Sequence, residues 1–266
     1  MVIGSSAGSA MNLPTSYNDD VVIKASHLGK LYPLYNNRRD RLKQALFGSF
    51  HTYYKPFWAL RDICLEVSRG ERIGILGRNG SGKTTLLQMI CGMTSPTKGE
   101  LLVKGSVAPI LALGGAFDLE STGRANIVIG GSVMGLKRRV VKERLDSIIE
   151  FAGIGDFVDQ PLKYYSSGMK ARLAFALCAH ADADILVVDE ALAVGDSAFQ
   201  KRCMDWIERF CTTGTLLFVS HSMDDVFRLC RKAVWIENGT FRQVGDPHDV
   251  AKEYSQAMAS GFDEHM

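Results

Sequence analysis

Short apolar runs alternate with amphipathic segments along most of the chain. Apolar runs occur at residues 73–76 (IGIL), 185–188 (ILVV) and 215–219 (TLLFV), and such runs are typical of strands buried on both faces of a parallel sheet. Residues 141–154 (VKERLDSIIEFAGI) instead have helical periodicity. Residues 233–245 read as a hairpin that turns at Asn238 and Gly239. This alternation predicts an α/β fold.

The remaining segments divide the chain. Residues 21–32 and 57–67 read as further strands, and residues 117–166 as a helical insert. Residues 1–20 are small, polar and turn-rich, and we expect them to form a disordered tail. The folded domain is expected to span residues 21–256, followed by a short tail at residues 257–266.

Residues 36–50 (NNRRDRLKQALFGSF) interrupt the strand pattern between residues 32 and 57. Basic and apolar side chains alternate there with helical spacing, which predicts a basic amphipathic helix. Two interpretations stay open. The helix is either a solvated surface element, or it lies near a membrane surface or a partner protein. The side chains concerned are Arg38, Arg39, Arg41, Lys43, Leu42, Ala45, Leu46 and Phe50.

Charge and composition narrow the class of protein. The 31 Lys and Arg residues nearly balance the 29 Asp and Glu residues, and a net charge of +2 predicts no nucleic-acid partner. Six cysteines lie scattered without a CxxC pair, so we expect mostly buried, reduced thiols and a cytosolic compartment. No apolar run approaches the ~20 residues needed to cross a bilayer. Any role at a membrane is therefore expected to need a partner.

Residues 77–84 (GRNGSGKT) fit the pattern GxxxxGK[ST] between a predicted strand and a predicted helix. The glycines let backbone N–H groups turn toward phosphates, the lysine reaches the outer phosphates, and the threonine hydroxyl is placed to bind Mg²⁺. A chance glycine-rich turn is the alternative, and the flanking strand and helix disfavour it. The expected nucleotide-binding residues are Gly77, Arg78, Asn79, Gly80, Ser81, Gly82, Lys83, Thr84 and Thr85.

Two buried strands end in groups that suit phosphate chemistry. Asp189 and Glu190 follow the run at residues 185–188, so Asp189 with Thr84 is expected to hold Mg²⁺, and Glu190 to polarise the attacking water. His221 ends the next strand, where it could hydrogen-bond the γ-phosphate. Taken alone, the Asp-Glu pair could instead begin a loop or cap a helix, and a lone histidine is usually structural.

Residues 164–170 (YYSSGMK) contain a second candidate anion-binding site. Two serines and a glycine, Ser166, Ser167 and Gly168, open a predicted helix. The amino end of a helix favours negative charge. A plain helix cap is the alternative reading of the isolated motif.

In this order, a phosphate loop, a serine-glycine helix start, Val-Val-Asp-Glu and a strand-end histidine resemble an ATP-binding-cassette (ABC) ATPase over residues 21–254. The resemblance implies a P-loop NTPase core with a small antiparallel β-subdomain and a helical subdomain. It also implies ATP and Mg²⁺ as cofactors and a head-to-tail homodimer. In such a dimer, the signature of one copy contacts the γ-phosphate held by the other. Here that signature comprises Ser166, Ser167, Gly168 and Met169, and Asp196 belongs to the loop that crosses the dimer interface.

Several details are similar to the ATPases of polysaccharide exporters. These are the variant signature at residues 165–169, the DEALAVGD continuation, the segment at residues 111–127 and the insertion at about residues 33–56, which those exporters use as a helix near the membrane. The likeness implies ATP-driven export of a lipid-linked polysaccharide, with a separate multi-span permease, at the cytoplasmic face of the plasma (inner) membrane. Export of another cargo, such as a lipid or drug, and a soluble ABC ATPase without a transport role are the alternatives.

Three further points concern coupling to the permease, glycan recognition and adenine binding. No glutamine stands near Leu113 or Gly114, where the family places one that couples the metal site to the permease. Some O-antigen exporters carry a carbohydrate-binding extension; we do not expect one after residues 248–258, so glycan recognition is expected to lie elsewhere. Tyr32 is the candidate for stacking on adenine, although Tyr35 is close and an aromatic ring packed in the β-subdomain is the alternative.

Overall fold

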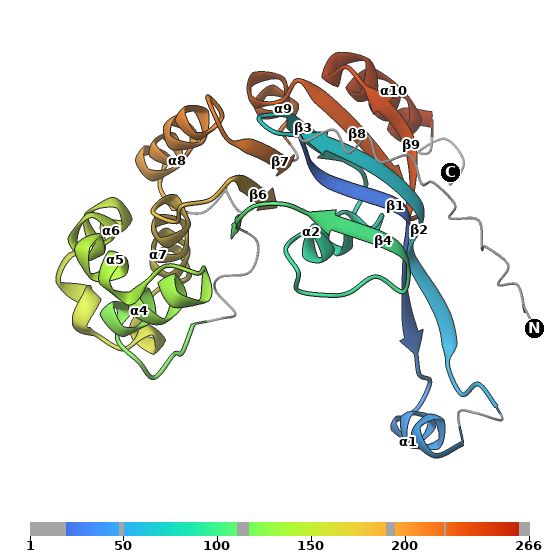
Figure 1. Cartoon of the computed structure of the whole chain (residues 1–266), viewed down its shortest axis with the longest axis horizontal. Coiled ribbons are helices and arrows are strands. Elements are labelled where there is room, and N and C mark those ends of the chain that lie inside the picture. Colours follow the sequence, from blue (N-terminus) through green and yellow to red (C-terminus); the bar gives the residue numbers. More distant parts are fainter. Residues whose placement is uncertain (1–19, 48–50, 111–116, 190–194, 221, 261–266) are drawn as a thin grey trace, which may run out of the picture.

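The chain folds around a six-stranded sheet. The computed structural model describes residues 20–47, 51–110, 117–189, 195–220 and 222–260 (Figure 1). The first five strands in the sheet order are parallel, and only the last pair is antiparallel. The α/β class predicted from the apolar runs is therefore confirmed. The strands, in sheet order, are β5 (Val107–Ile110), β6 (Ile185–Asp189), β7 (Thr215–Val219), β3 (Arg72–Leu76), β8 (Lys232–Glu237) and β9 (Thr240–Gly245).

Helices and a second sheet cover the two faces of this sheet, which explains the continuous apolar runs. All five residues of β7 and the first four of β6 are buried. One face packs on helix α2 (Lys83–Ile90) and on the second sheet, and the other face packs on helices. These helices are α7 (Ser167–Ala179), α8 (Ser197–Phe210), α9 (Met223–Leu229) and α10 (Pro247–Ser260).

The second sheet is antiparallel and has three strands in the order β2 (Lys55–Ser68), β1 (Val21–Leu34) and β4 (Lys98–Val103). Strands β1 and β2 run beyond the body of the molecule, and α1 (Arg38–Phe47) lies at the far end of this extension (Figure 1). No residue of α1 is buried. A helix within residues 36–50 is thus confirmed at Arg38–Phe47, and it projects from the fold, whereas residues 48–50, with Phe50, lie outside the described residues.

The helical part has its own core, which combines residues such as Phe117, Ile127 and Ile148 with Leu173 and Leu177 of α7. Its other elements are α4 (Gly123–Val133), α5 (Arg138–Glu143), α6 (Leu145–Ala152) and the short 3-10 helices η1 (Gly155–Asp159) and η2 (Leu162–Tyr164). The boundaries at residues 117 and 166, like those of the two tails, stay predictions. No helix within the described ranges is long and apolar enough to cross a membrane.

One helix expected from the sequence is divided in two. The pattern at residues 141–154 predicts continuous periodicity, yet α5 ends and α6 begins on either side of Arg144. The Arg144 guanidinium donates hydrogen bonds to the backbone carbonyl of His180 at 2.6 Å and to both carboxylate oxygens of Asp182 at 2.8 and 3.0 Å. These contacts with the end of α7 are tertiary, so a local pattern does not contain them.

Candidate nucleotide site

The predicted phosphate loop connects β3 to α2, as its motif requires. Gly80 and Gly82 have φ angles of 79° and 112°, which side chains rarely tolerate. A Cβ atom on Gly82 would lie 2.7 Å from the Ala59 carbonyl oxygen and 2.7 Å from Leu60 Cδ2. The phosphate loop therefore lies directly against β2 at Gly82, and only glycine fits at this position.

The backbone of the phosphate loop surrounds the Lys83 ammonium. Its Nζ donates hydrogen bonds to the carbonyl oxygens of Gly77 at 2.7 Å and Arg78 at 3.1 Å. The residue is only 6% exposed. A buried ammonium held by the loop that surrounds it provides positive charge where phosphate oxygens would approach.

Thr84 and Asp189 meet at the metal site predicted from the sequence. The hydroxyl of Thr84, at the start of α2, donates a hydrogen bond of 3.0 Å to Oδ2 of Asp189, at the carboxyl end of β6. The two residues are 105 positions apart in the sequence. A hydroxyl and a carboxylate oxygen are hard oxygen ligands of the kind that Mg²⁺ prefers.

The buried hydroxyl of Ser81 indicates whether a phosphate group fits the loop. The residue is 6% exposed, and its hydroxyl oxygen is a buried polar atom without a hydrogen-bond partner in the described structure. Buried polar groups are normally paired, because an unpaired one is costly. A bound phosphate oxygen would accept a hydrogen bond from this hydroxyl. The donor set of the loop, with Lys83 and Thr84, therefore fits a Mg²⁺-bound nucleotide.

A cavity of about 450 Å³ opens beside the loop and extends to the antiparallel sheet. Tyr32 and Phe57 form its aromatic side, and they are paired across β1 and β2. Tyr35 does not line this cavity and instead packs edge-on against Tyr54, with ring centroids 5.9 Å apart. Of the two tyrosines considered from the sequence, Tyr32 is the one beside the phosphate loop. The other lining residues are Ala59, Asn79, Gly80, Gly82, Lys83, Thr84 and Thr85.

The second candidate anion-binding site opens α7, as the sequence predicts. Ser166 caps this helix, and its hydroxyl oxygen accepts a hydrogen bond of 3.1 Å from the backbone N–H of Met169. Ser166 and Ser167 are exposed, and Gly168 is partly exposed. Among the described residues that line the cavity beside the phosphate loop, none belongs to residues 166–169. Within one chain, the phosphate loop and residues 166–169 therefore do not line a common cavity.

Asp196 is tied to the helix that carries the signature. It caps α8 by accepting a hydrogen bond of 2.8 Å from the backbone N–H of Phe199, and it forms an ion pair with Arg172 of α7. The hydrogen bond from Phe199 is the main cause that lowers the pKa of this carboxyl group, and Arg172 adds to it. The Arg172 guanidinium also lies 5.3 Å from the ring centroid of Phe199.

Two side chains of the site are missing from the sequence prediction. Phe57 gives no signal of its own, because it is one aromatic residue in an ordinary strand pattern. Arg172 lies at helical spacing after the signature, and only the fold shows that it reaches Asp196. Conversely, Glu190, His221, Leu113 and Gly114 lie outside the described residues, so their predicted roles stay predictions.

Comparisons with known proteins identify the family of this chain. The profile of the family described as ABC transporter matches residues 60–193. The chain is 42% identical to the O-antigen export system ATP-binding protein RfbB of Klebsiella pneumoniae over 243 residues, which cover 90% of this chain and 99% of that protein. It is 43% identical over 237 residues to the teichoic acids export ATP-binding protein TagH of Bacillus anthracis, covering 89% of this chain and 43% of TagH.

Solved structures extend the agreement to the fold. A dimeric, post-hydrolysis structure of the ATP-binding cassette MJ0796 bound to ADP and Pi superimposes with a TM-score of 0.69 at 16% identity, covering 85% of this chain and 98% of that one. At such low identity the likeness concerns the fold alone. Together with the family match and the phosphate loop, it shows that this chain belongs to the ABC transporter family and is one of its ATP-hydrolysing, nucleotide-binding subunits.

Proposed function

We propose that this chain is the ATPase subunit of a transporter that exports a lipid-linked polysaccharide across the cytoplasmic membrane. The cargo class rests on the relatives, since RfbB, which matches over nearly its full length, is named as an O-antigen export protein and TagH as a teichoic acids export protein. The chain would act as a peripheral subunit at the cytoplasmic face, under a separate multi-span permease.

The observation that supports this mechanism best is the separation of the two candidate anion-binding sites. Lys83, Ser81 and Thr84 belong to the phosphate loop and the start of α2, whereas residues 166–169, of which Ser166 and Ser167 are exposed and Gly168 and Met169 partly exposed, line no part of the cavity beside that loop. An exposed helix start with Ser167 and Gly168 suits the γ-phosphate held by a second copy. Two such chains in head-to-tail contact would close two nucleotides between them.

Within each composite site, the residues divide the work. Tyr32 stacks on the adenine ring, the loop glycines direct N–H groups toward the phosphates, and Lys83 neutralises the outer phosphate charge. Thr84 and Asp189 would hold Mg²⁺, which would supply positive charge against the phosphates. Glu190 polarises the attacking water, and His221 contacts the γ-phosphate.

Asp196 is proposed to transmit the state of the nucleotide. It belongs to the loop expected at the dimer interface, and its ion pair with Arg172 joins that loop to the signature helix. Closure around ATP would therefore move α7 and α8 together, and the helical part would carry this movement to the permease. Hydrolysis removes the γ-phosphate contacts and lets the dimer reopen.

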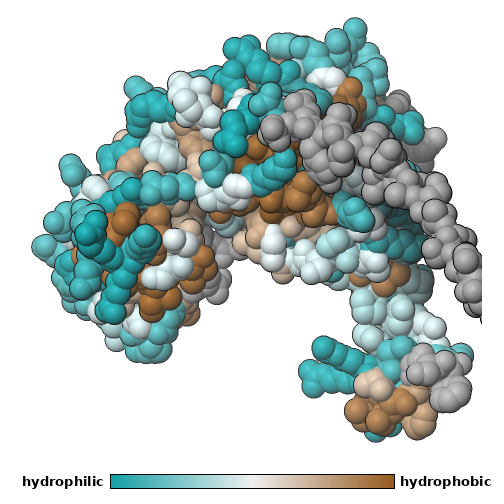
Figure 2. All heavy atoms as spheres, in the orientation of Figure 1, coloured by the Kyte–Doolittle hydropathy of each residue, from teal (hydrophilic) through white to brown (hydrophobic). Residues whose placement is uncertain are grey.

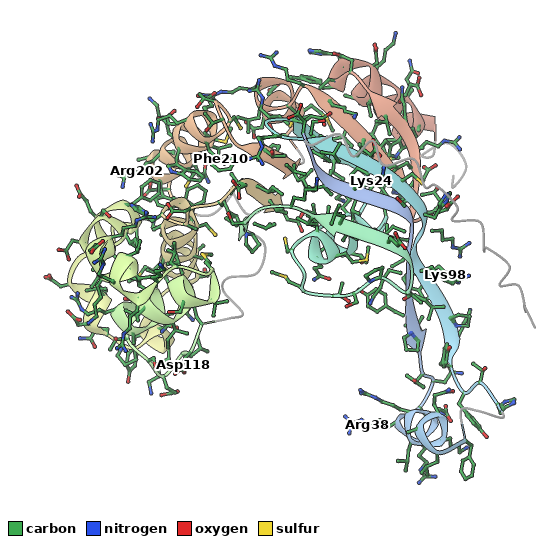
Figure 3. The ribbon with its side chains drawn as sticks, viewed as in Figure 1. Lys24, Arg38, Lys98, Asp118, Arg202 and Phe210 are labelled. Atoms are coloured by element: carbon green, nitrogen blue, oxygen red, sulfur yellow. The ribbon has the colours of Figure 1, made fainter. Side chains whose placement is uncertain are left out.

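Helix α1 is the proposed contact with the membrane region. It extends away from the body of the molecule with Arg38 near its start (Figure 3) and with apolar side chains on its outer surface (Figure 2). Leu42, Leu46 and Phe47 are 65%, 67% and 53% exposed. Basic residues beside an exposed apolar surface suit the boundary between anionic headgroups and acyl chains, or the membrane-proximal part of a permease.

The function is tested by affinity purification of Glu190→Gln with ATP from detergent-solubilised native membranes. Mass spectrometry then identifies the proteins and lipids that co-purify. The proposal expects a multi-span permease accompanied by a lipid-linked glycan. Lys83→Ala is the control, because it should lose the ATP-dependent association. A permease bound to a drug or a simple lipid would overturn the cargo, and association with ribosomes would overturn the transport role.

A further inference from the structure

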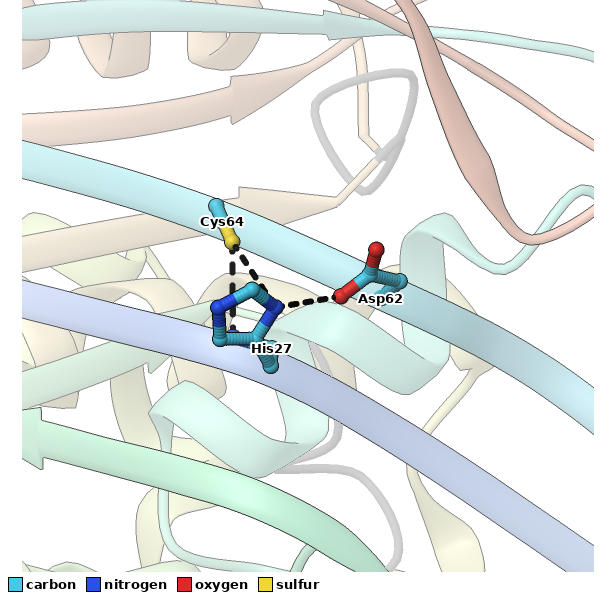
Figure 4. Close-up of side chains that lie close together, drawn as sticks. All are labelled: His27, Asp62 and Cys64. Atoms are coloured by element: carbon cyan, nitrogen blue, oxygen red, sulfur yellow. Dashed lines mark hydrogen bonds and ion pairs between the residues drawn. The ribbon is translucent and has the colours of Figure 1, made fainter.

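Three residues that the nucleotide site does not use gather on the outer surface of the antiparallel sheet. His27 on β1 lies beside Asp62 and Cys64 on β2, and one ligand-type atom from each lies within 4.8 Å of the others (Figure 4). The separations are 2.6 Å from His27 Nδ1 to Asp62 Oδ1 and 3.9 Å from His27 Nδ1 to Cys64 Sγ. None of the three lines the nucleotide cavity.

The backbone brings these side chains together at a distortion in the sheet. The pairing of β1 with β2 shifts register on both sides of Leu28. His27 and Asp62 have φ angles of 50° and 54°, and the described residues contain only one other non-glycine residue with positive φ, Asn238. The sulfur atom of Cys64 also accepts a hydrogen bond of 3.4 Å from the backbone N–H of His27.

A contribution to folding stability does not account for this arrangement. The side chains of His27 and Asp62 are 79% and 75% exposed, and an exposed ion pair contributes little to folding. Cys64 is exposed as well, whereas four of the six cysteines are buried and Cys91 is partly buried. An exposed cysteine is uncommon, because cysteine is among the residue types most often buried.

The three groups match the donors of a zinc site. Imidazole nitrogen, thiolate sulfur and carboxylate oxygen bind Zn²⁺ at about 2.0 to 2.3 Å, which places tetrahedral ligand atoms roughly 3.2 to 3.8 Å apart. The separations of 2.6 and 3.9 Å from His27 Nδ1 lie on either side of this range, and all three ligand atoms lie within 4.8 Å of one another. A neutral imidazole, a thiolate and a carboxylate together carry two negative charges, which balance the charge of the ion.

Two of the three residues, His27 and Asp62, also border a cavity. The cavity has a volume of about 770 Å³, and Trp58 and Arg61 line it as well. Such a cavity gives room for a water molecule as the fourth ligand, which is the pattern of open zinc sites with three protein ligands. We propose that His27, Asp62 and Cys64 form a Zn²⁺ site that joins β1 to β2 on the surface of the antiparallel sheet.

The test uses Co²⁺ as a spectroscopic substitute for Zn²⁺, with the untagged full-length chain saturated with Mg²⁺ and ADP. Each chain is expected to bind one Co²⁺ with a thiolate-to-metal charge-transfer band in the near ultraviolet, and Zn²⁺ should abolish this band. In Cys64→Ser the band should disappear, and Zn²⁺ affinity by equilibrium dialysis should fall at least about tenfold. His27→Asn should weaken binding similarly, because asparagine tolerates positive φ but removes the imidazole.

Cys91→Ser is the matched control. Burial raises the pKa of the Cys91 thiol to about 12, so it supplies no thiolate near neutral pH, and its replacement should leave the band unchanged. Unchanged ADP affinity shows that each variant folds. The proposal is overturned if the wild-type chain shows no charge-transfer band, or if Cys64→Ser retains both the band and the Zn²⁺ affinity.

Discussion

Replacement of Gly82 by alanine tests the geometry of the phosphate loop. Gly82 precedes α2 with a φ of 112°, and an added Cβ would meet the Ala59 carbonyl oxygen and Leu60 Cδ2, each at 2.7 Å. Gly80 in the same loop is the control. It also has a positive φ, 79°, but an added Cβ would have no atom within 4 Å. Comparison of the two variants separates close approach from backbone conformation.

The expected magnitudes follow from these contacts. At Gly82, the unfavourable backbone conformation costs about 1 to 3 kcal/mol, and crowding against β2 costs about 1 to 3 kcal/mol more. The lower entropy of the unfolded alanine chain offsets roughly 0.4 to 1 kcal/mol. Gly82→Ala should therefore lower the free energy of unfolding by about 1 to 5.6 kcal/mol. At Gly80 only the backbone cost of about 1 to 2 kcal/mol applies, so Gly80→Ala should lower the free energy of unfolding by no more than about 1.6 kcal/mol.

Urea unfolding of the nucleotide-free chain measures both values, and titration with MgATP measures the consequence for binding. Gly82→Ala should bind MgATP at least about tenfold more weakly, because a shift of the loop displaces the N–H groups that face the phosphates. If the two variants differ in stability by less than about 0.5 kcal/mol, or if Gly82→Ala binds MgATP normally, the close approach of β2 to the loop is wrong.

Three further outcomes are expected. Thr84→Val removes the hydroxyl that donates to Asp189; Mg²⁺-dependent ATP hydrolysis should fall at least about tenfold, whereas binding of Mg²⁺-free nucleotide should change little. Phe218 on β7 is 1% exposed, so Phe218→Ala should lower the free energy of unfolding in urea by about 3 to 5 kcal/mol. The backbone N–H and the hydroxyl of Ser106 bond to Asp184 and lower the pKa of its carboxyl group. A lowered pKa stabilises the fold at neutral pH, and this contribution is lost as the pH falls through the folded-state value; Asp184→Asn should therefore lose less stability in acid than the wild-type chain, as measured by urea midpoints across pH.

The sequence predicts those parts of the fold and site that local patterns encode. The apolar runs locate β3, β6 and β7, because strands covered on both faces need continuous apolar residues. Asn238 and Gly239, with φ angles of 50° and 79°, form the turn between β8 and β9. The phosphate loop and the start of α7 are predicted equally well, since their spacing is fixed by a short stretch of backbone.

Features that depend on distant segments are not predicted. The break between α5 and α6 falls at Arg144, whose side chain contacts residues at and after the end of α7. The ion pair of Asp196 with Arg172 joins two helices that sequence reasoning treats separately. His27 and Asp62 are 35 positions apart in the sequence, and they meet only because the two bulged strands that carry them lie side by side. Such pairings become visible only when the chain is folded.

Each ATP site is proposed to be shared between two chains, and a mixture of two inactive variants measures whether this is so. Lys83→Ala removes the lysine proposed to bind the phosphates but keeps residues 166–169. Gly168→Asp places a negative charge at the signature but keeps the phosphate loop; an added Cβ at this position meets only Ser166 Oγ, at 3.8 Å, so the variant should fold. Each purified variant alone should lack ATPase activity.

A mixed dimer would contain one intact site, built from the phosphate loop of the Gly168→Asp chain and the signature of the Lys83→Ala chain. ATPase activity is therefore expected to appear when the two variants are combined at equal concentration. A mixture as inactive as either variant alone would contradict a site shared between two copies.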